Sequence, residues 1–253
     1  MKKIPFMGIE IDNLTPNEII EQIFQRIQEK NPIHIVGVNV DQIVRVQNNP
    51  ISKKIFQNAS IVFVDGKPIK WMCRLLGTPI KERITGPDLM EYICQCLAQY
   101  HVRVFLLGAG PNVAAKCGDV LMKKYPGIIV SQTYSPPFGF ENNPVEIASI
   151  NRMLVESHSD ILFVGMGSPK QDIFIYENMH IYNIPVSISM GAAIDFIAGN
   201  VKRAPKWMIR CGLEWLHRIS QNPKRLWKRY LITDMAIIPM FFNEFIKKYN
   251  HGK

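Results

Sequence analysis

Residues 160–172 read DILFVGMGSPKQD, and this stretch sets the pattern from which the fold is predicted. Its unbroken apolar run is typical of a strand buried on both faces, and the proline after the glycines is typical of a first helical turn. Five further apolar runs of this kind lie at residues 33–38, 60–64, 102–108, 127–133 and 185–190. Because helical patterns of roughly 10–15 residues separate the runs, we predict an α/β fold: a doubly wound, mostly parallel sheet with helices on both faces.

The pattern changes near Asn200, where we place a domain boundary. Residues 1–200 contain the predicted sheet, whereas residues 201–253 contain tryptophans, basic residues and amphipathic helical spacing. Residues 202–229 hold nine basic residues and a single acid, Glu214, so they contribute +8 of the chain's formal charge of +9. The basicity is therefore concentrated in a helical C-terminal appendage.

Composition and segment lengths exclude several classes of protein. Of the 253 residues, 47% are hydrophobic and 20% charged, an ordinary mixture for a globular chain. The five cysteines are scattered and form no CxxC pair, which favours a reducing compartment over a disulfide framework or a zinc site. The N-terminus does not read as a secretory signal, and no stretch reaches the roughly 20 apolar residues of a transmembrane helix. We therefore expect a protein that is soluble or peripheral to a membrane.

The basic appendage has three interpretations. Its segment WMIRCGLEWLHRISQNPKRLWKRYL (207–231) could be a helical pair with a solvated basic face, a nucleic-acid-binding surface, or an interfacial helix on a membrane. In the last case aromatic and apolar residues lie at the lipid headgroups while the cations contact anionic lipid. The aromatic content and the adjoining run MAIIPMFF (235–242) favour the membrane interpretation.

Small and polar residues follow five of the predicted strands. Because ligands of an open parallel sheet bind outside the carboxyl ends of its strands, these residues are the candidates for a site. They are Asn39 and Asp41 after the first strand, Asp65 after the second, Gly108–Asn112 after the third, Gln171 and Asp172 after the fifth, and Asp195 after the sixth.

Asp65 has two interpretations of equal weight on its position alone. It can cap the helix that begins at Lys67, or it can act as a general base whose proton affinity is tuned by partial burial. The sequence by itself does not decide between them.

Three other candidates are equally open. Gln171 is either an exposed first-turn residue, in a helix capped by Ser168, or an amide that points into the cleft. Asp195 either caps its own helix or bonds a base or hydroxyl. Arg83 is either a solvated loop charge or a clamp on a ligand.

The turn LLGAGPNVA (106–114) places Gly108 and Gly110 between a strand and a helix. Such a turn lets backbone N–H groups and a helix N-terminus approach a phosphate, although glycine-rich turns also occur for purely steric reasons. Val113 occupies the third glycine position of a GxGxxG motif, so NAD binding is disfavoured.

The sequence does not support metal chemistry. It has no DxD motif, and its six histidines show no HxH or HxxxH spacing. A nucleotide diphosphate leaving group would then be neutralised by arginines, lysines or helix ends, which the appendage can supply.

Seven segments of the chain match, in the same order, sequence motifs of a known protein family. They are GVNVDQIV (37–44), VDGKP (64–68), ERITGPDLM (82–90), FLLGAGPNVA (105–114), VGMGSPKQD (164–172), GAAIDFIAG (191–199) and RAPKWMIRCGLEWLHRISQNPKRLWKRYL (203–231). In this order they closely resemble the WecG/TagA/CpsF glycosyltransferases, glycosyltransferase family 26. The last segment is long and specific to that family.

The resemblance implies an inverting, metal-independent transferase with a Rossmann-like, GT-E-like fold. Members transfer a sugar, of the N-acetylmannosamine type or a hexose, from a UDP-sugar to a sugar on undecaprenyl diphosphate in teichoic acid or cell-surface polysaccharide synthesis. The UDP-sugar is a co-substrate, and no cofactor is implied. The expected location is cytoplasmic, peripheral on the inner leaflet of the cell membrane, with a homo-oligomer possible and no nucleic acid partner.

The matching motifs imply roles for four residues near the predicted sheet edge. Asp65 matches a base that deprotonates the acceptor hydroxyl, and Asn39 matches a cleft asparagine needed for activity. Arg83 and Gln171 match residues that line the same pocket.

The motifs also imply contacts with the nucleotide. Asp195 and the turn from Gly108 through Gly110 and Asn112 to Val113 match nucleotide contacts. Arg218 and Arg225 match appendage arginines that fold over the donor diphosphate at the membrane, and the next basic position, Lys228 or Arg229, matches a third.

Two positions depart from the family pattern, and two rival functions stay open. Gly37 replaces a threonine common in the family, which removes a hydroxyl from the expected pocket, and Asp172 replaces a glutamate.

The first rival function is a nucleotide-binding module with a basic lipid- or nucleic-acid-binding face and no turnover. The second is a cofactor-dependent reductase. The donor sugar, the acceptor sugar and the pathway are left open.

Overall fold

A six-stranded parallel sheet forms the centre of residues 3–250, the part of the chain that the computed structural model describes, apart from the side chains of Lys206 and Arg225. The strand order is β4-β3-β8-β7-β5-β6. The strands are β3 (Ile33–Val38), β4 (Ile61–Val64), β5 (Arg103–Gly108), β6 (Ile129–Tyr134), β7 (Ile161–Gly165) and β8 (Val186–Ser189). Each predicted strand is confirmed, with small shifts of its ends.

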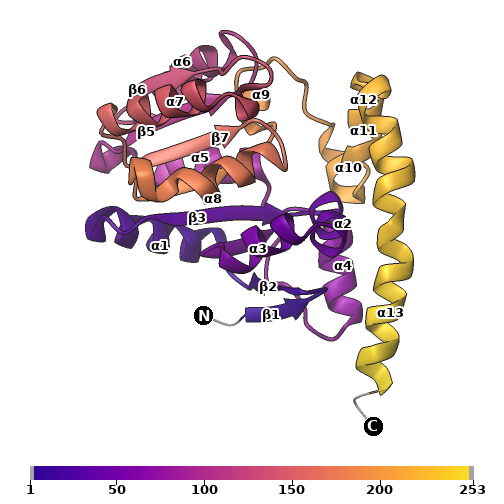
Figure 1. Cartoon of the computed structure of the whole chain (residues 1–253). Helices are drawn as coiled ribbons and strands as arrows, with labels where there is room; N and C mark the ends of the chain where they lie inside the picture. The colour runs from indigo at the N-terminus through magenta and orange to yellow at the C-terminus, as the bar shows by residue number, and fades with distance from the viewer. Residues whose placement is uncertain (1–2, 251–253) are drawn as a thin grey trace.

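Helices cover both faces of this sheet (Figure 1), as predicted. One face carries α1 (Pro16–Glu29), α5 (Gly86–Leu97), α6 (Val113–Lys124) and α9 (Ala193–Ile197). The other carries α2 (Val40–Asn48), α3 (Pro50–Asn58), α4 (Lys67–Leu75), α7 (Pro144–Glu156) and α8 (Lys170–Tyr182). Neighbouring strand residues alternate between the two cores: Ile35 packs in the first, and Val36 packs in the second. Burial on both faces is why the strands read as continuous apolar runs.

A two-stranded hairpin, β1 (Lys3–Phe6) and β2 (Ile9–Asp12), packs beside β4 and was not predicted. Its two-residue turn has Met7 and Gly8 with φ of 45° and 83°, which suits the twist of paired strands. The Asp12 carboxylate accepts a hydrogen bond of 2.9 Å from the Val62 amide. Methionine rarely adopts a positive φ, so the sequence carries little signal for this turn.

Residues 206–250 are helical and lie across the carboxyl ends of the strands (Figure 1). They form α10 (Lys206–Cys211), α11 (Glu214–Gln221), α12 (Pro223–Lys228), a π-helical turn (Arg229–Thr233), a 3₁₀ turn (Asp234–Ala236) and α13 (Ile237–Asn250). The predicted helical character of the appendage is confirmed. The appendage packs directly on the core, because Ile237 and Phe241 of α13 are buried among residues of α2, α4 and the hairpin. The boundary at Asn200 as a division between domains stays a prediction.

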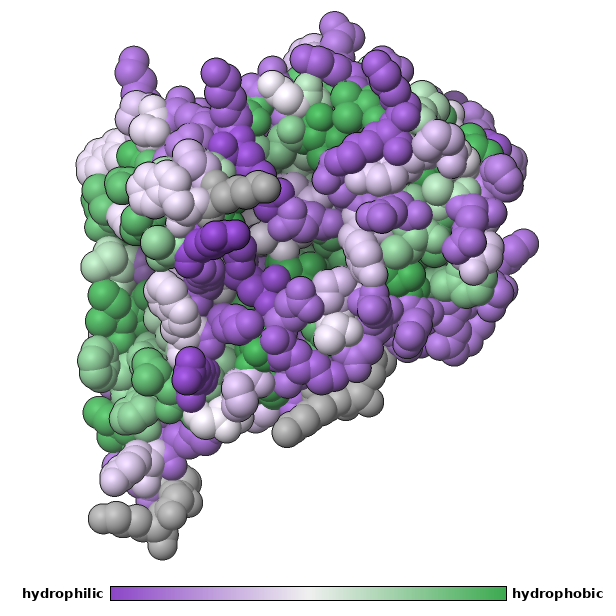
Figure 2. All heavy atoms as spheres, turned by 180° about the vertical axis from the view of Figure 1, so that it is seen from behind, coloured by the Kyte–Doolittle hydropathy of each residue, from purple (hydrophilic) through white to green (hydrophobic). Residues whose placement is uncertain are grey.

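The opposite side of α13 leaves large apolar side chains exposed. Figure 2 shows an apolar band along the edge of the molecule where α13 lies. We call it the outer strip, and its residues are Leu231, Met235, Ile238, Phe242, Phe245, Ile246 and Tyr249. Apart from the adjacent pair Phe245 and Ile246, they recur at intervals of three or four, the spacing of one helical face. Across the described residues, every helix is too short or too polar to cross a bilayer.

Candidate active site

Among the described residues, three adjoining cavities lie along the carboxyl edge of the sheet. The polar cleft has a volume of about 640 Å³ and runs past the ends of β3, β4, β7 and β8. The apolar pocket, about 360 Å³, lies between α4 and the appendage, and the glycine-turn cavity, about 340 Å³, lies beyond β5. Asn39, Asp65 and Arg218 line both of the first two, and Asp195 lines both the polar cleft and the glycine-turn cavity. The three therefore form one continuous site.

Asp65 lies at the wall shared by the polar cleft and the apolar pocket. Its interpretation as a helix cap is wrong, because Gly66 occupies the N-cap position of α4 and, within the described residues, no side chain caps that helix. Burial raises the pKa of Asp65 to about 6, with Glu214 adding to this effect while Arg218 and Arg83 oppose it. A carboxylate with this pKa is largely ionised at neutral pH and can still accept a proton.

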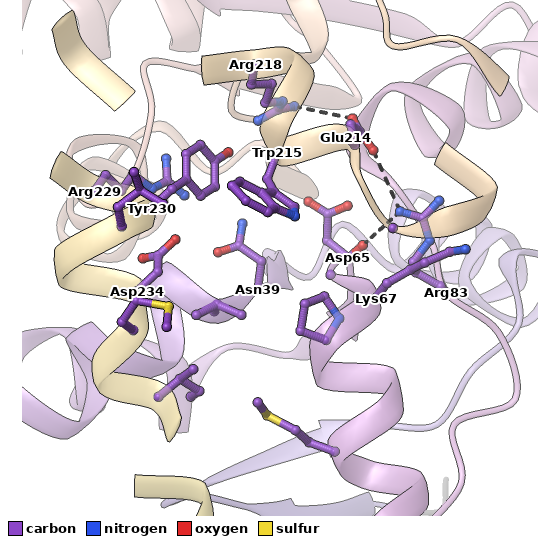
Figure 3. Close-up of a pocket in the computed structure, with 18 of the residues that line it drawn as sticks. Asn39, Asp65, Lys67, Arg83, Glu214, Trp215, Arg218, Arg229, Tyr230 and Asp234 are labelled. Atoms are coloured by element: carbon purple, nitrogen blue, oxygen red, sulfur yellow. Dashed lines mark hydrogen bonds and ion pairs between the residues drawn. The ribbon is translucent and has the colours of Figure 1, made fainter. Parts of the chain in front are cut away.

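Asn39 is fixed by its own helix at the mouth of this site. Its Oδ1 accepts the amides of Asp41 at 3.0 Å and Gln42 at 3.4 Å, and Gln42 Oε1 in turn accepts the Asn39 amide at 3.0 Å. This reciprocal capping box orients the side chain. The Asn39 amide group points into the cavity beside Asp65 (Figure 3).

Glu214 joins two guanidinium groups next to Asp65 (Figure 3). Its carboxylate lies 3.8 Å from Arg83 NH1 and 3.8 Å from Arg218 NH2. Arg83 NH1 also donates to the backbone carbonyl of Asp65 at 3.4 Å, and its side chain is only 16% exposed. The interpretation of Arg83 as a solvated loop charge is therefore wrong. Glu214 was not among the predicted site residues, although its position as the single acid of the basic segment 202–229 was a usable signal.

Arg229 reaches the same site but is anchored to the core. Its NH2 lies 3.4 Å from Asp41 Oδ2, which also accepts from Arg45 Nε at 3.1 Å. Asp234 lies beside Arg229, and burial raises the pKa of Asp234 to about 6 while Arg229 opposes the shift. These contacts hold the π-helical turn of the appendage against the start of α2. The side chain of Arg225, which was predicted beside Arg218 to contact the donor diphosphate, lies outside the described residues.

Gln171 ties together the loops that follow β7 and β8. Its Oε1 accepts the amides of Gly167 at 3.1 Å and Gly191 at 3.0 Å, and the residue is 2% exposed. The interpretation of Gln171 as an exposed first-turn residue is therefore wrong. Ser168 is not the helix cap either, because Pro169 occupies that position.

Asp172, next in the chain, is fully buried. Burial raises the pKa of its carboxyl group, and the nearby side chains of Ser189 and Ser168 oppose that shift. It therefore lies beneath the cleft and does not line it.

The glycine turn forms the far end of the site. Gly108 has a φ of +111°, and a Cβ there would lie 2.6 Å from the Gly165 carbonyl oxygen, so glycine is required at this position for steric reasons. Gly108 and Gly110 line the glycine-turn cavity together with Asp195. Asn112 and Val113 are not among the residues that line the three cavities in the described structure, because Asn112 is exposed and Val113 packs toward the core.

Gly37 leaves room for an aromatic ring beside Asp65. A Cβ at Gly37 would lie 2.8 Å from the ring of Phe63 and 3.4 Å from the Asp65 Cβ. Phe63 therefore occupies the space that a side chain at position 37 would need, and both residues line the polar cleft.

Several residues that line the site were not predicted, because their neighbours in space are distant in the chain. Trp215 and Tyr230 of the appendage face Asn39 and Asp65 across the apolar pocket (Figure 3), and Lys67 lies at the start of α4. Arg203, also missed, makes a bidentate contact with Asp88 at 2.5 and 2.7 Å and so holds the start of the appendage on α5. Among the described residues, no group of three or more His, Cys, Asp or Glu side chains is placed to hold a metal ion.

Comparisons with known proteins assign the chain to a family. The sequence model of the "Glycosyl transferase WecG/TagA/CpsF family" matches residues 4–251. A protein of Bacillus spizizenii named N-acetylglucosaminyldiphosphoundecaprenol N-acetyl-beta-D-mannosaminyltransferase is 32% identical over 78% of this chain and 74% of its own length. A protein of the same name from Staphylococcus aureus (strain MW2) is 27% identical over 97% of this chain and 92% of its own length. The chain belongs to the WecG/TagA/CpsF family of glycosyl transferases.

Proposed function

We propose that this protein transfers an N-acetylmannosamine-type sugar from UDP to the N-acetylglucosamine of an undecaprenyl-diphosphate-linked acceptor. The names of the Bacillus and Staphylococcus relatives support the sugar, the acceptor and the lipid carrier. The observation that carries the proposal is Asp65, a partly buried carboxylate with a pKa of about 6, at the wall shared by a polar and an apolar cavity. Such a position suits a base that contacts two different substrates.

The proposed reaction is a single in-line displacement. Asp65 accepts the proton of the acceptor hydroxyl as that oxygen attacks the anomeric carbon, and the bond from this carbon to the UDP oxygen breaks with inversion. Arg218 and Arg229, which line the polar cleft, neutralise the charge that develops on the diphosphate. The uridine end lies toward Asp195 and the glycine turn.

The other predicted residues take positioning roles in this proposal. Gln171 holds the loops after β7 and β8 that form the floor of the cleft. Arg83 and Glu214 hold the appendage beside Asp65, and Asn39 orients the acceptor sugar through its amide.

We further propose that the appendage lies on the inner leaflet of the cell membrane from the cytoplasmic side. The outer strip exposes seven large apolar side chains in a continuous helical face, and the neighbouring segment 202–229 carries nine basic residues. Apolar side chains insert among headgroups while cations contact anionic lipid, so the two features together favour an interfacial position. The acceptor's lipid carrier would then be presented at the same surface.

The transfer is tested by incubating the protein with UDP-N-acetylmannosamine and N-acetylglucosaminyl diphosphate carrying a short lipid, with EDTA present. A disaccharide product, identified by mass and by a β-configured linkage in NMR, supports the proposal and its metal independence. Tight binding of UDP without product for any UDP-sugar offered would instead favour a binding module without turnover.

A further inference from the structure

The apolar pocket has walls that the transfer of one sugar to another does not require. It lies between α4 and the appendage and has a volume of about 360 Å³. Its walls are mostly hydrocarbon, and they include Met72 of α4, Trp215 of α11, Leu231 of the π-helical turn and Ile238 of α13. An apolar group that enters this pocket removes both its own surface and that of the walls from water, so the pocket suits an apolar ligand.

Charged side chains gather where this pocket meets the polar cleft. Lys67 and Arg83 line the apolar pocket and, within the described residues, do not line the polar cleft. Arg218 and Arg229 line both cavities. Lys67 and Arg83 therefore face the apolar pocket alone, whereas Arg218 and Arg229 can contact a ligand in either cavity, so the site has cations for two separate diphosphates.

The distances along α4 suit a ligand with a charged head and an apolar tail. Lys67 begins α4 next to Asp65, and Met72 lies about 7.5 Å further along the same helix, at about 1.5 Å per residue. The Lys67 ammonium donates to the Arg210 carbonyl, which fixes it over the gap between α4 and α10. A diphosphate at Lys67 would therefore direct an attached tail toward Met72.

The pocket is continuous with the outer strip. Leu231, Met235 and Ile238 line the pocket, and all three are also between 43% and 53% exposed on the strip. A hydrocarbon chain that leaves the pocket beside these three side chains therefore meets the apolar surface of the strip.

We propose that the apolar pocket binds the first isoprene units of a polyprenyl diphosphate acceptor, with Lys67 and Arg83 at the acceptor's diphosphate. The proposal rests on the proposed function for the identity of the acceptor. An apolar cavity of about 150 Å³ holds one benzene molecule, so the pocket has room for roughly a dozen carbon atoms, or about two isoprene units. The remainder of the chain extends over the outer strip.

The first test measures binding and does not depend on sugar transfer. Geranyl diphosphate, which has two isoprene units, is compared with methyl diphosphate by calorimetry on the full-length protein, below the concentration at which micelles form. We expect geranyl diphosphate to bind about tenfold or more tightly than methyl diphosphate, because its hydrocarbon leaves water. Equal affinities would overturn the proposal, and tighter binding of decanoate than of geranyl diphosphate would assign the pocket to a fatty acyl chain instead.

Matched variants locate the binding site. Met72→Gln and Ile238→Gln place an amide in the pocket wall, and each should remove most of the geranyl advantage while leaving the affinity for methyl diphosphate unchanged. Leu75→Gln is the control, because Leu75 lies on the same helix as Met72, is 65% exposed and lies outside the pocket lining. Equal losses in Met72→Gln and Leu75→Gln would place the prenyl group elsewhere and overturn the proposal.

The second test separates this proposal from the proposed function. Acceptors that carry N-acetylglucosaminyl diphosphate on a methyl, prenyl or geranyl group are compared in kcat/KM. We expect a rise of about tenfold or more from methyl to geranyl in the wild type, and a flat series in Met72→Gln. A flat series in the wild type overturns the pocket assignment while transfer stands. Selective binding of geranyl diphosphate without transfer to any acceptor leaves the prenyl site standing and overturns the proposed reaction.

Discussion

The Glu214 carboxylate of the appendage lies 3.8 Å from the Arg83 guanidinium of the core, beside Asp65. A second oxygen of the same carboxylate lies 3.8 Å from Arg218. Glu214 therefore holds two cations at the site and also acts on the base, since its charge raises the pKa of Asp65. The carboxylate that connects the appendage to the core therefore also raises the proton affinity of Asp65.

The first prediction concerns pH. Asp65 must be deprotonated to accept a proton, and its pKa is about 6, so kcat/KM should fall as pH decreases through about 6. Glu214→Gln removes a negative charge that raises this pKa, so the acid limb should move to lower pH. The measurement is kcat/KM from pH 4.5 to 8, a range of about two units around the expected limb. Glu21→Gln, an exposed change on α1, is the control, and an unmoved limb in Glu214→Gln would contradict the electrostatic role.

The second prediction concerns the base itself. Asp65→Asn keeps the shape of the side chain but removes its capacity to accept a proton at neutral pH. We expect kcat to fall about 10²- to 10⁴-fold, with the affinity for UDP within about threefold of wild type by calorimetry. Turnover near the wild-type rate in this variant would show that another group accepts the proton.

The third prediction concerns the loops at the floor of the cleft. Gln171→Met removes the acceptor for two buried amides, those of Gly167 and Gly191. Each amide left without a partner costs about 1–3 kcal/mol, so both Tm and kcat/KM should fall. Gln95→Met, at an exposed position on α5, tests the effect of the substitution alone. If both variants keep the wild-type Tm, the two hydrogen bonds do not stabilise the fold.

The fourth prediction concerns the membrane. Phe242→Ser combined with Ile246→Ser removes two exposed side chains of the outer strip that lie outside the apolar pocket. We expect co-sedimentation with anionic vesicles to weaken by about tenfold or more, because less apolar surface inserts at the interface. Ile181→Ser, an equally exposed change on α8, should bind vesicles as the wild type does. Identical binding of all three proteins would exclude the outer strip as the docking face.

The fifth prediction concerns the appendage as a whole. A chain that ends at Asn200 lacks Arg218, Arg229 and Glu214, and it should have no transferase activity on a lipid-linked acceptor. Its Tm should also fall, because Ile237 and Phe241 no longer cover the core on α2 and α4. Both are measured on the purified truncated chain beside the full-length protein. Full activity of the truncated chain would show that the sheet domain is a complete enzyme.

The sheet was predictable because a parallel strand that is buried on both faces consists of a continuous run of apolar residues. The runs at 33–38 and 160–167 are apolar regardless of what packs on them, so hydrophobicity alone located the strands. The position of the site was predictable for a related reason: the carboxyl ends of parallel strands meet at one edge, which brought Asn39, Asp65 and Gln171 together. The β1–β2 hairpin was missed because its turn uses Met7, a residue with no local preference for that conformation.

The sequence by itself therefore determined the fold class, the edge of the sheet that holds the site and the family. It could not determine which of two possible roles a side chain takes. That role depends on contacts with groups that are distant in the chain. Asp65 could cap a helix or accept a proton, and the choice follows from its burial beneath Glu214 and Arg218, about 150 residues away. The apolar pocket likewise exists only where α13 and α11 close over α4. Tertiary structure decided these points because desolvation and charge act through space, whereas sequence patterns report neighbours along the chain.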